Sequence, residues 1–213
     1  MDARQLSPLD RLLEVANDAL RTGFARLPAR RPPPESAARD LPAAGPRRRE
    51  AARLMRVNHA GEVAAQGLYS GHALTARTPG TRDLLHRAAA EEADHLAWCR
   101  ERLAELGSRS SLLDPVWYGA SFMIGALAGL AGDPVGLGFV AETERQVEGH
   151  LDRHLVALPA ADRRSRAIVA SMKADEIAHA EAARRAGAIP LPRPAVMLMG
   201  LCARIMTGTA RWI

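Results

Sequence analysis

The chain has 213 residues, a formal net charge of +5 and an apolar content of 47%, yet aromatic residues make up only 4% of it. This length suffices for one sizeable core, and a core built from Ala, Leu, Val and Met favours packed helices over a sheet. The two cysteines, Cys99 and Cys202, show no pairing pattern, and no secretory signal accompanies them. We therefore expect an all-α protein in a reducing compartment, with both cysteines as buried, inert thiols.

The excess positive charge lies in the first 56 residues, which hold 12 Arg against 7 Asp or Glu, whereas residues 57–213 are balanced. Such an arm could contact anionic lipid or nucleic acid. Acidic residues interrupt its arginines, however, and no stacking aromatic residues are interleaved with them, so we expect no nucleic-acid partner. The same acidic residues argue against a transit peptide, and we expect the N-terminus to be retained.

The arm divides into two predicted segments. Apolar residues recur at helical spacing from Leu9 to Leu27, after a Ser7-Pro8 start, which predicts a short amphipathic helix. Residues 28–46 are rich in Pro, Arg and Ala and predict an extended or mobile linker. We therefore assign residues 1–46 to the helix and linker, and residues 47–213 to the main domain.

The main domain contains two predicted helix pairs. Its turn signals are Thr78-Pro79-Gly80, Gly107, Pro159 and Gly187. The four helices are predicted at about 47–77, 81–106, 134–158 and 161–186. This pattern indicates an up-and-down helical hairpin that is duplicated around a pseudo-twofold axis.

Each pair carries the same ligand pattern, a lone Glu followed by Glu-x-x-His 30 positions later in the first copy and 32 in the second. The residues are Glu62, Glu92 and His95, then Glu144, Glu176 and His179. Residues i and i+3 share a helix face, so each Glu-x-x-His can hold one ion. Ferritin-like di-metal bundles use this set, with a Glu from each of two helices and Glu-x-x-His from each of the others.

Charge and ligand chemistry also indicate metal. Four carboxylates balance two divalent ions, whereas four packed together without metal would repel one another. Carboxylate and imidazole ligands with no thiolate nearby suit iron or manganese better than structural zinc or copper. We therefore predict a carboxylate-bridged di-iron site in a ferritin-like four-helix bundle.

An acidic residue stands directly before each Glu-x-x-His. Metal-bound imidazoles usually donate their other N–H group to a carboxylate. We therefore expect Glu91 to reach His179 and Asp175 to reach His95, as a symmetric pair across the two copies. Solvated acids with no such role are an equal alternative.

Other polar residues lie near the ligands in the sequence. For three of them, a role at the site and ordinary hydrogen-bonded packing are equally compatible with the pattern. These three are His59, Tyr69 and His150. The remaining histidines, His72, His86 and His154, are assigned to the surface.

Two apolar stretches fall outside the helix pairs, at 115–132 and 194–203. Each is short for a membrane span, which needs about 20 apolar residues, so additional membrane-facing helices at the interface are predicted. Arg204, Arg211 and Trp212 suit a headgroup boundary. Peripheral membrane attachment and completion of a soluble core both remain open. Exposed apolar helices would also favour a homo-oligomer or attachment to a membrane-bound complex.

Four segments give the chain a family resemblance over residues 47–213. They are Met-Arg-Val-Asn-His-Ala-Gly-Glu at 55–62, Glu-Glu-Ala-Asp-His-Leu at 91–96, Glu-Thr-Glu at 142–144 and Asp-Glu-Ile-Ala-His at 175–179. Together they resemble the demethoxyubiquinone hydroxylases of ubiquinone biosynthesis. The Asn-His-Ala-Gly-Glu part is more specific than any Glu-x-x-His and distinguishes the chain from iron-storing relatives.

The resemblance implies a peripheral di-iron monooxygenase on the cytoplasmic face of the inner membrane. Its substrates would be O2 and the ring of a 2-polyprenyl-3-methyl-6-methoxy-1,4-benzoquinol. It further implies two iron ions per chain, an external electron donor and membership of a ubiquinone-biosynthesis complex. The six residues above match the family's ligand positions and would act in catalysis through the iron, with Glu92 and Glu176 as bridges. Glu142 competes with Glu144, but two positions turn a helical side chain by about 200°, and Glu144 matches the family motif better.

Three alternatives use the same residues differently. A ferritin-like ferroxidase or iron store would share the ligands, but the apolar stretches oppose a hydrophilic cage. A peroxidase of the rubrerythrin type would need a Cys-x-x-Cys pair for its extra iron, which the sequence lacks. A non-catalytic lipid-binding or scaffold protein would leave four converging Glu residues unexplained.

Overall fold

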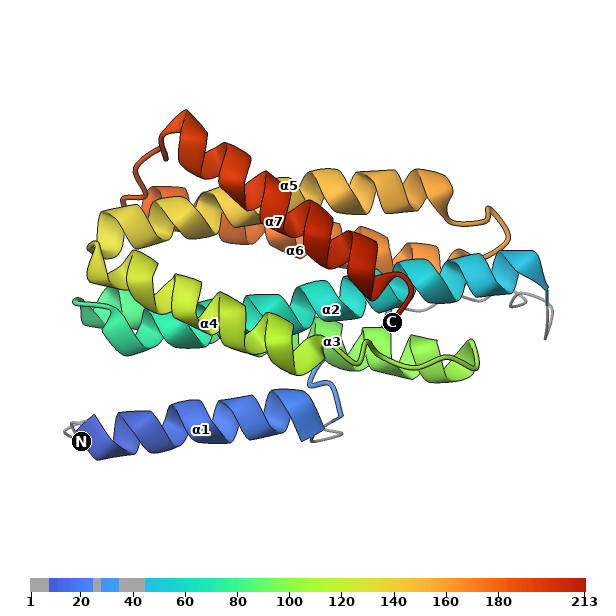
Figure 1. Cartoon of the computed structure of the whole chain (residues 1–213), viewed down its shortest axis with the longest axis horizontal. Coiled ribbons are helices and arrows are strands. Elements are labelled where there is room, and N and C mark those ends of the chain that lie inside the picture. Colours follow the sequence, from blue (N-terminus) through green and yellow to red (C-terminus); the bar gives the residue numbers. More distant parts are fainter. Residues whose placement is uncertain (1–7, 25–27, 35–44) are drawn as a thin grey trace.

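A computed structural model describes residues 8–24, 28–34 and 45–213, and within these ranges all regular structure is helical (Figure 1). The helices are α1 (Pro8–Phe24), α2 (Pro46–Thr75), α3 (Pro79–Glu105), α4 (Asp114–Leu130), α5 (Asp133–Ala157), α6 (Arg163–Arg185) and α7 (Arg193–Ala210). The predicted all-α class is confirmed for the described part of the chain.

The two predicted helix pairs are α2 with α3 and α5 with α6, and their observed ends differ from the predicted ones by one or two residues. Thr78 caps α3, because its side chain accepts a hydrogen bond from the backbone N–H of Thr81. Gly107 and Gly187 follow α3 and α6 with φ values of 68° and 101°, a left-handed region that glycine adopts at little cost. Local signals therefore end these helices.

Two apolar clusters fill the interior and lie at opposite ends of the two helix pairs. The first includes Met55 near the start of α2 and Trp98 near the end of α3, together with Ile168 of α6. The second includes Leu85 near the start of α3 and Leu137 near the start of α5. The predicted metal ligands lie between these clusters along each helix, so both ends of the site are held by packed side chains.

Helix α4 packs directly on the backbone of α2. A Cβ atom at Gly71 of α2 would lie 2.0 Å from the carbonyl oxygen of Phe122, and one at Gly125 of α4 would lie 2.1 Å from that of Leu68. Both distances are shorter than any real contact of a Cβ atom, so only glycine allows this approach. The stretch predicted at 115–132 is therefore a helix held tightly against the bundle along one face.

The other faces of α4 and α7 are apolar and exposed. Both helices lie on the near side of the molecule in Figure 1. We call their exposed apolar side chains the apolar face: Val116, Met123, Ile124, Leu127, Leu130, Met197, Leu198, Leu201 and Ile205. None of the helices in the described residues is both long enough and apolar enough to cross a bilayer.

The N-terminal arm contains the predicted helix, α1. Its last predicted apolar position, Leu27, lies outside the described residues. Residues 28–34 are not helical, as predicted for the linker, and residues 35–44 also lie outside the described part. Helix α2 begins at Pro46.

Three assignments made from the sequence were wrong. Cys202 is exposed on α7, where Ala210 is the one fully buried residue, whereas Cys99 is buried as expected. His72 was assigned to the surface but is buried, since Gly136 leaves space for its ring. His154 is also buried, and its Nδ1 lies 2.7 Å from Asn58 Oδ1. His86 is exposed, as predicted.

Candidate metal centre

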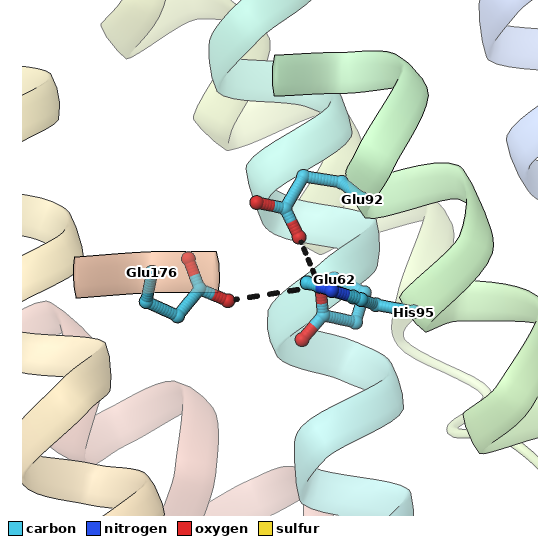
Figure 2. Close-up of side chains that lie close together, drawn as sticks. All are labelled: Glu62, Glu92, His95 and Glu176. Atoms are coloured by element: carbon cyan, nitrogen blue, oxygen red, sulfur yellow. Dashed lines mark hydrogen bonds and ion pairs between the residues drawn. The ribbon is translucent and has the colours of Figure 1, made fainter. Parts of the chain in front are cut away.

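Four helices bring the predicted ligands together in the interior. Figure 2 shows Glu62 of α2, Glu92 and His95 of α3, and Glu176 of α6 converging on one point. Two groups of side chains have ligand atoms within 4.8 Å of one another. The first group is Glu62, Glu92, His95 and Glu176, and the second is Glu92, Glu144, Glu176 and His179. All six residues are buried.

Glu92 and Glu176 belong to both groups, and each presents one oxygen to each histidine. Glu92 Oε2 lies 2.9 Å from His95 Nδ1, while its Oε1 lies 3.0 Å from His179 Nδ1. Glu176 Oε1 lies 3.8 Å from His95 Nδ1, and its Oε2 lies 3.6 Å from His179 Nδ1. This two-sided arrangement is the one expected of carboxylates that bridge two ions. Their assignment as bridges stays a prediction.

The electrostatics of the site favour bound positive charge. Burial, reinforced by neighbouring carboxylates, raises the pKa of Glu62 and of Glu144 well above the ordinary value. Burial alone would lower the pKa of His179, but the carboxylates of Glu176 and Glu92 raise it to about 12. The same carboxylates that favour positive charge on this histidine would favour a bound cation.

The residues present fit a metal ion on a second ground. Two buried carboxylate oxygens in the cluster have no hydrogen-bond partner among the described residues: Glu62 Oε2 and Glu176 Oε2. Unpartnered buried carboxylate oxygens are costly, and they are rare in proteins unless an ion or water completes them. An oxygen-rich set with two imidazoles suits a hard or borderline metal such as iron.

The outer nitrogens of both histidines meet the carboxylates named from the sequence. His95 Nε2 lies 2.9 Å from Asp175 Oδ2, and His179 Nε2 lies 2.8 Å from Glu91 Oε2. Each Nδ1 therefore faces the cluster while each Nε2 faces an acid from the other helix pair. Burial opposes the charge on Asp175, but hydrogen bonds from His95 and Arg31 hold its pKa at about 2. These contacts orient both imidazole rings.

Glu142 and Glu144 point in different directions, and Glu144 as a ligand stays a prediction. Glu144 is buried in the second group of ligands, and its carboxylate accepts a hydrogen bond from the Tyr69 hydroxyl. Glu142 points away and pairs with Arg145 at 2.6 Å. Burial raises the pKa of Tyr69 well above its ordinary value, so this hydroxyl stays protonated and donates.

Tyr69→Phe is expected to weaken iron binding about tenfold, because it removes the donor that orients the Glu144 carboxylate. Anaerobic titration with Fe(II) measures this effect. Tyr118→Phe serves as the control, since Tyr118 lies on α4 outside the ligand set. Equal iron affinity in the two variants would show that the Tyr69 hydroxyl is only a packing contact.

The remaining candidate histidines lie near the ligands without joining them. His59 is buried, and its Nδ1 lies 3.1 Å from Asp114 Oδ2. The ring of His150 lies 3.9 Å from that of His154, and burial lowers the pKa of His150 to about 4. Both histidines are therefore placed by packing partners that their positions in the sequence did not reveal.

Sequence reasoning missed two residues at the outer edge of the site. Asp94 is buried and accepts hydrogen bonds from the linker backbone, and Arg31 pairs with Asp175. Asp94 lies inside the first Glu-x-x-His pattern, and this position is the one feature of the sequence that could have marked it as a residue of the site. Nothing in the sequence marked Arg31, because the path of a proline-rich linker has no periodicity.

A cavity of about 240 Å³ adjoins the second group of ligands. Its lining includes Tyr69, His179, Val140 and Ala178, together with Arg87 and Arg185. It gives a small molecule access to the His179 side of the centre.

The chain is similar to proteins of known name over most of its length. The family model described as "Ubiquinone biosynthesis protein COQ7" matches residues 49–210. A protein of Bordetella parapertussis named 3-demethoxyubiquinol 3-hydroxylase is 55% identical over 211 residues, which cover 99% of this chain and 95% of that protein. A protein of the same name from Xanthomonas euvesicatoria is 56% identical over 204 residues, covering 96% of this chain and 94% of that one.

Proposed function

The chain belongs to the family of ubiquinone biosynthesis protein COQ7, and from this premise we propose that it is a di-iron monooxygenase that hydroxylates the ring of 3-demethoxyubiquinol. It is a hydroxylase of ubiquinone biosynthesis, as its relatives' shared name and high identity indicate. The observation that supports the metal chemistry is the pair of buried ligand groups that share Glu92 and Glu176.

Each residue of the centre has a definite task in this proposal. Glu62 and His95 would hold one iron, Glu144 and His179 would hold the other, and the two shared carboxylates would bridge them. Bound iron would supply the activation of O2 that no protein side chain can perform. Burial of all six side chains limits their contact with bulk water.

The size of the cavity beside His179 bears on how a lipid-tailed substrate would bind. Pockets for drug-sized ligands span roughly 300 to 1,000 Å³. At about 240 Å³ the cavity suits a quinol ring but not its polyprenyl tail. We therefore place the ring beside Tyr69 and His179 and leave the tail outside the bundle.

The apolar face of α4 and α7 is the surface that we propose to rest on a membrane. It consists of exposed aliphatic side chains on α4 and α7, and exposed apolar side chains on helices favour contact with a membrane surface. The exposed Trp212 and Arg204 suit the headgroup boundary. The cytoplasmic face of the inner membrane is the proposed location. Self-association and membership of a larger complex stay predictions.

A charge placed on the apolar face is expected to weaken binding to lipid vesicles. The double variant Leu127→Glu, Leu201→Glu puts two carboxylates where apolar side chains would enter the headgroup region, and we expect at least a tenfold loss in co-sedimentation. Val156→Glu is the control, because Val156 is 88% exposed on α5, outside the apolar face. Equal vesicle binding by the two variants would show that the apolar face does not contact the membrane.

The proposed function is tested by profiling membrane quinones in cells that lack this chain. The demethoxy intermediate is expected to accumulate, and the native chain, but not the Glu176→Ala variant, is expected to restore ubiquinone. Mass spectrometry separates the two quinones directly. Unchanged quinones would indicate that the centre serves ferroxidase or other iron-handling chemistry instead. Restoration of ubiquinone by the variant would rule out metal-dependent turnover.

A further inference from the structure

The linker segment 28–34 is fixed to the outside of the metal centre by its backbone. The backbone N–H of Arg30 donates to Asp94 Oδ1 at 2.6 Å, and that of Arg31 donates to Asp94 Oδ2 at 3.3 Å. The indole N–H of Trp98 donates to the carbonyl oxygen of Arg31 at 2.9 Å. Asp94 and Trp98 are buried residues of α3 on either side of His95. Three contacts thus hold the backbone at Arg31 in one place.

The Arg31 side chain continues from this anchor to the partner of a metal ligand. Its Nη2 lies 2.6 Å from Asp175 Oδ2, its Nη1 lies 3.4 Å from Asp175 Oδ1, and its guanidinium lies 4.9 Å from the centre of the Trp98 ring. A forked contact fixes both the position and the plane of a carboxylate, which a single point charge does not. The same Asp175 oxygen meets His95 Nε2.

The two halves of the centre differ in this respect. In the His179 half, the carboxylate that contacts the outer nitrogen of the histidine is Glu91. Among the described residues, Glu91 forms an ion pair only with His179. The side chain of Glu91 is 50% exposed, whereas that of Asp175 is 20% exposed. Glu91 lines the same cavity as Arg31, but among the described residues the guanidinium of Arg31 forms an ion pair with Asp175 and none with Glu91. The two helix pairs are therefore equivalent in their ligands, whereas in the described part of the chain the segment 28–34 pairs with the outer carboxylate of the His95 half.

We infer that Arg31 is a positioning residue that holds Asp175 against His95, and that the segment 28–34 thereby makes the His95 half of the centre bind metal more firmly than the His179 half. The inference depends on the proposed di-iron centre. A cavity of about 380 Å³ lies beside this contact, and its lining includes Arg31, Asp175 and Glu91. Water can therefore reach Asp175 from this side, and the forked contact is what keeps the carboxylate from turning towards it.

The test is the release of iron from the loaded full-length chain to a chelator, followed over time. Native protein is expected to lose its two irons in two phases. Outer partners of metal-bound histidines typically contribute 10- to 100-fold in affinity, so we expect Arg31→Gln to speed the slow phase about tenfold. Glu91→Gln is expected to speed only the fast phase.

Three further variants separate positioning from a general effect of charge. Arg30→Gln removes the same charge one residue away, and the side chain of Arg30 forms no ion pair with the described residues, so native release is expected. Arg31→Lys keeps the charge but not the fork, and an intermediate rate is expected. In the Asp175→Asn background, Arg31→Gln is expected to add much less than in the native background, because Asp175 accepts the shortest side-chain hydrogen bond of Arg31.

The outcomes distinguish this inference from the proposed function. If native protein holds two irons and hydroxylates the quinol, but Arg31→Gln releases iron at the rate of Arg30→Gln, the inference is wrong and the function stands. A single release phase in native protein also contradicts it. If native protein binds no iron, both proposals fail together. Mössbauer spectra of the loaded proteins give a second readout, since two inequivalent irons are expected in native protein and more similar ones in Arg31→Gln.

Discussion

Glu176→Ala is expected to abolish iron binding and quinol hydroxylation together. Glu176 faces both histidines, one with each carboxylate oxygen, so its removal takes a ligand from each half of the centre. Loss of an outer partner already costs metal proteins 10- to 100-fold, and loss of a bridging ligand should cost roughly 100-fold or more in turnover. Iron content is measured by elemental analysis and turnover by quinol hydroxylation.

The stability of the protein gives an independent test at the same position. In metal-free protein, burial and the nearby Glu92 raise the pKa of Glu176, which shows that its charged form is disfavoured there. Glu176→Gln should therefore raise the melting temperature of the metal-free chain, because Gln has nearly the same shape as Glu but no charge to bury. With iron bound, the same substitution should lower it, because a ligand is lost.

Glu142→Ala is the matched control for these experiments. Glu142 competes with Glu144 in the sequence but pairs with Arg145 outside the cluster. Normal iron content and near-native turnover are expected. Two irons and native turnover in Glu176→Ala, or iron loss in Glu142→Ala, would contradict the ligand assignment.

Gly71→Ala is expected to destabilise the fold by about 2 to 3 kcal/mol, the upper part of the usual range for overpacking. The new methyl group would lie 2.0 Å from the carbonyl oxygen of Phe122, which is backbone and cannot rotate away. Helix α4 must therefore move off α2. Alanine has a better helix propensity than glycine by about 1 kcal/mol, so the expected loss exceeds what propensity can restore. Chemical denaturation measures the change.

Gly119→Ala is the control for this crossing. Gly119 is also a helical residue of α4, but a Cβ atom there meets nothing within 4 Å. The substitution is expected to be neutral or to stabilise the fold by up to about 1 kcal/mol. Equal effects of the two substitutions would mean that α4 does not rest on α2 through its glycines.

The sequence alone determined the two helix pairs and the six candidate ligands. Both follow from local rules, since turn residues end helices within one or two positions and a spacing of three places Glu92 and His95 on one face. The pairings of Glu91 with His179 and of Asp175 with His95 were one of two alternatives that the sequence left open, the other being solvated acids, and the structure brings both pairs into contact. These features depend on periodicity, which a sequence displays directly.

Only the tertiary structure decided how separate segments approach one another. The burial of His72 depends on a glycine 64 positions away, and the exposure of Cys202 depends on what α7 leaves uncovered. Likewise, Arg31 lies in a linker with no repeating pattern and pairs with Asp175, which is 144 positions further along the chain. Such contacts arise from the packing of separate elements against one another. No local pattern in the sequence predicts them for these residues.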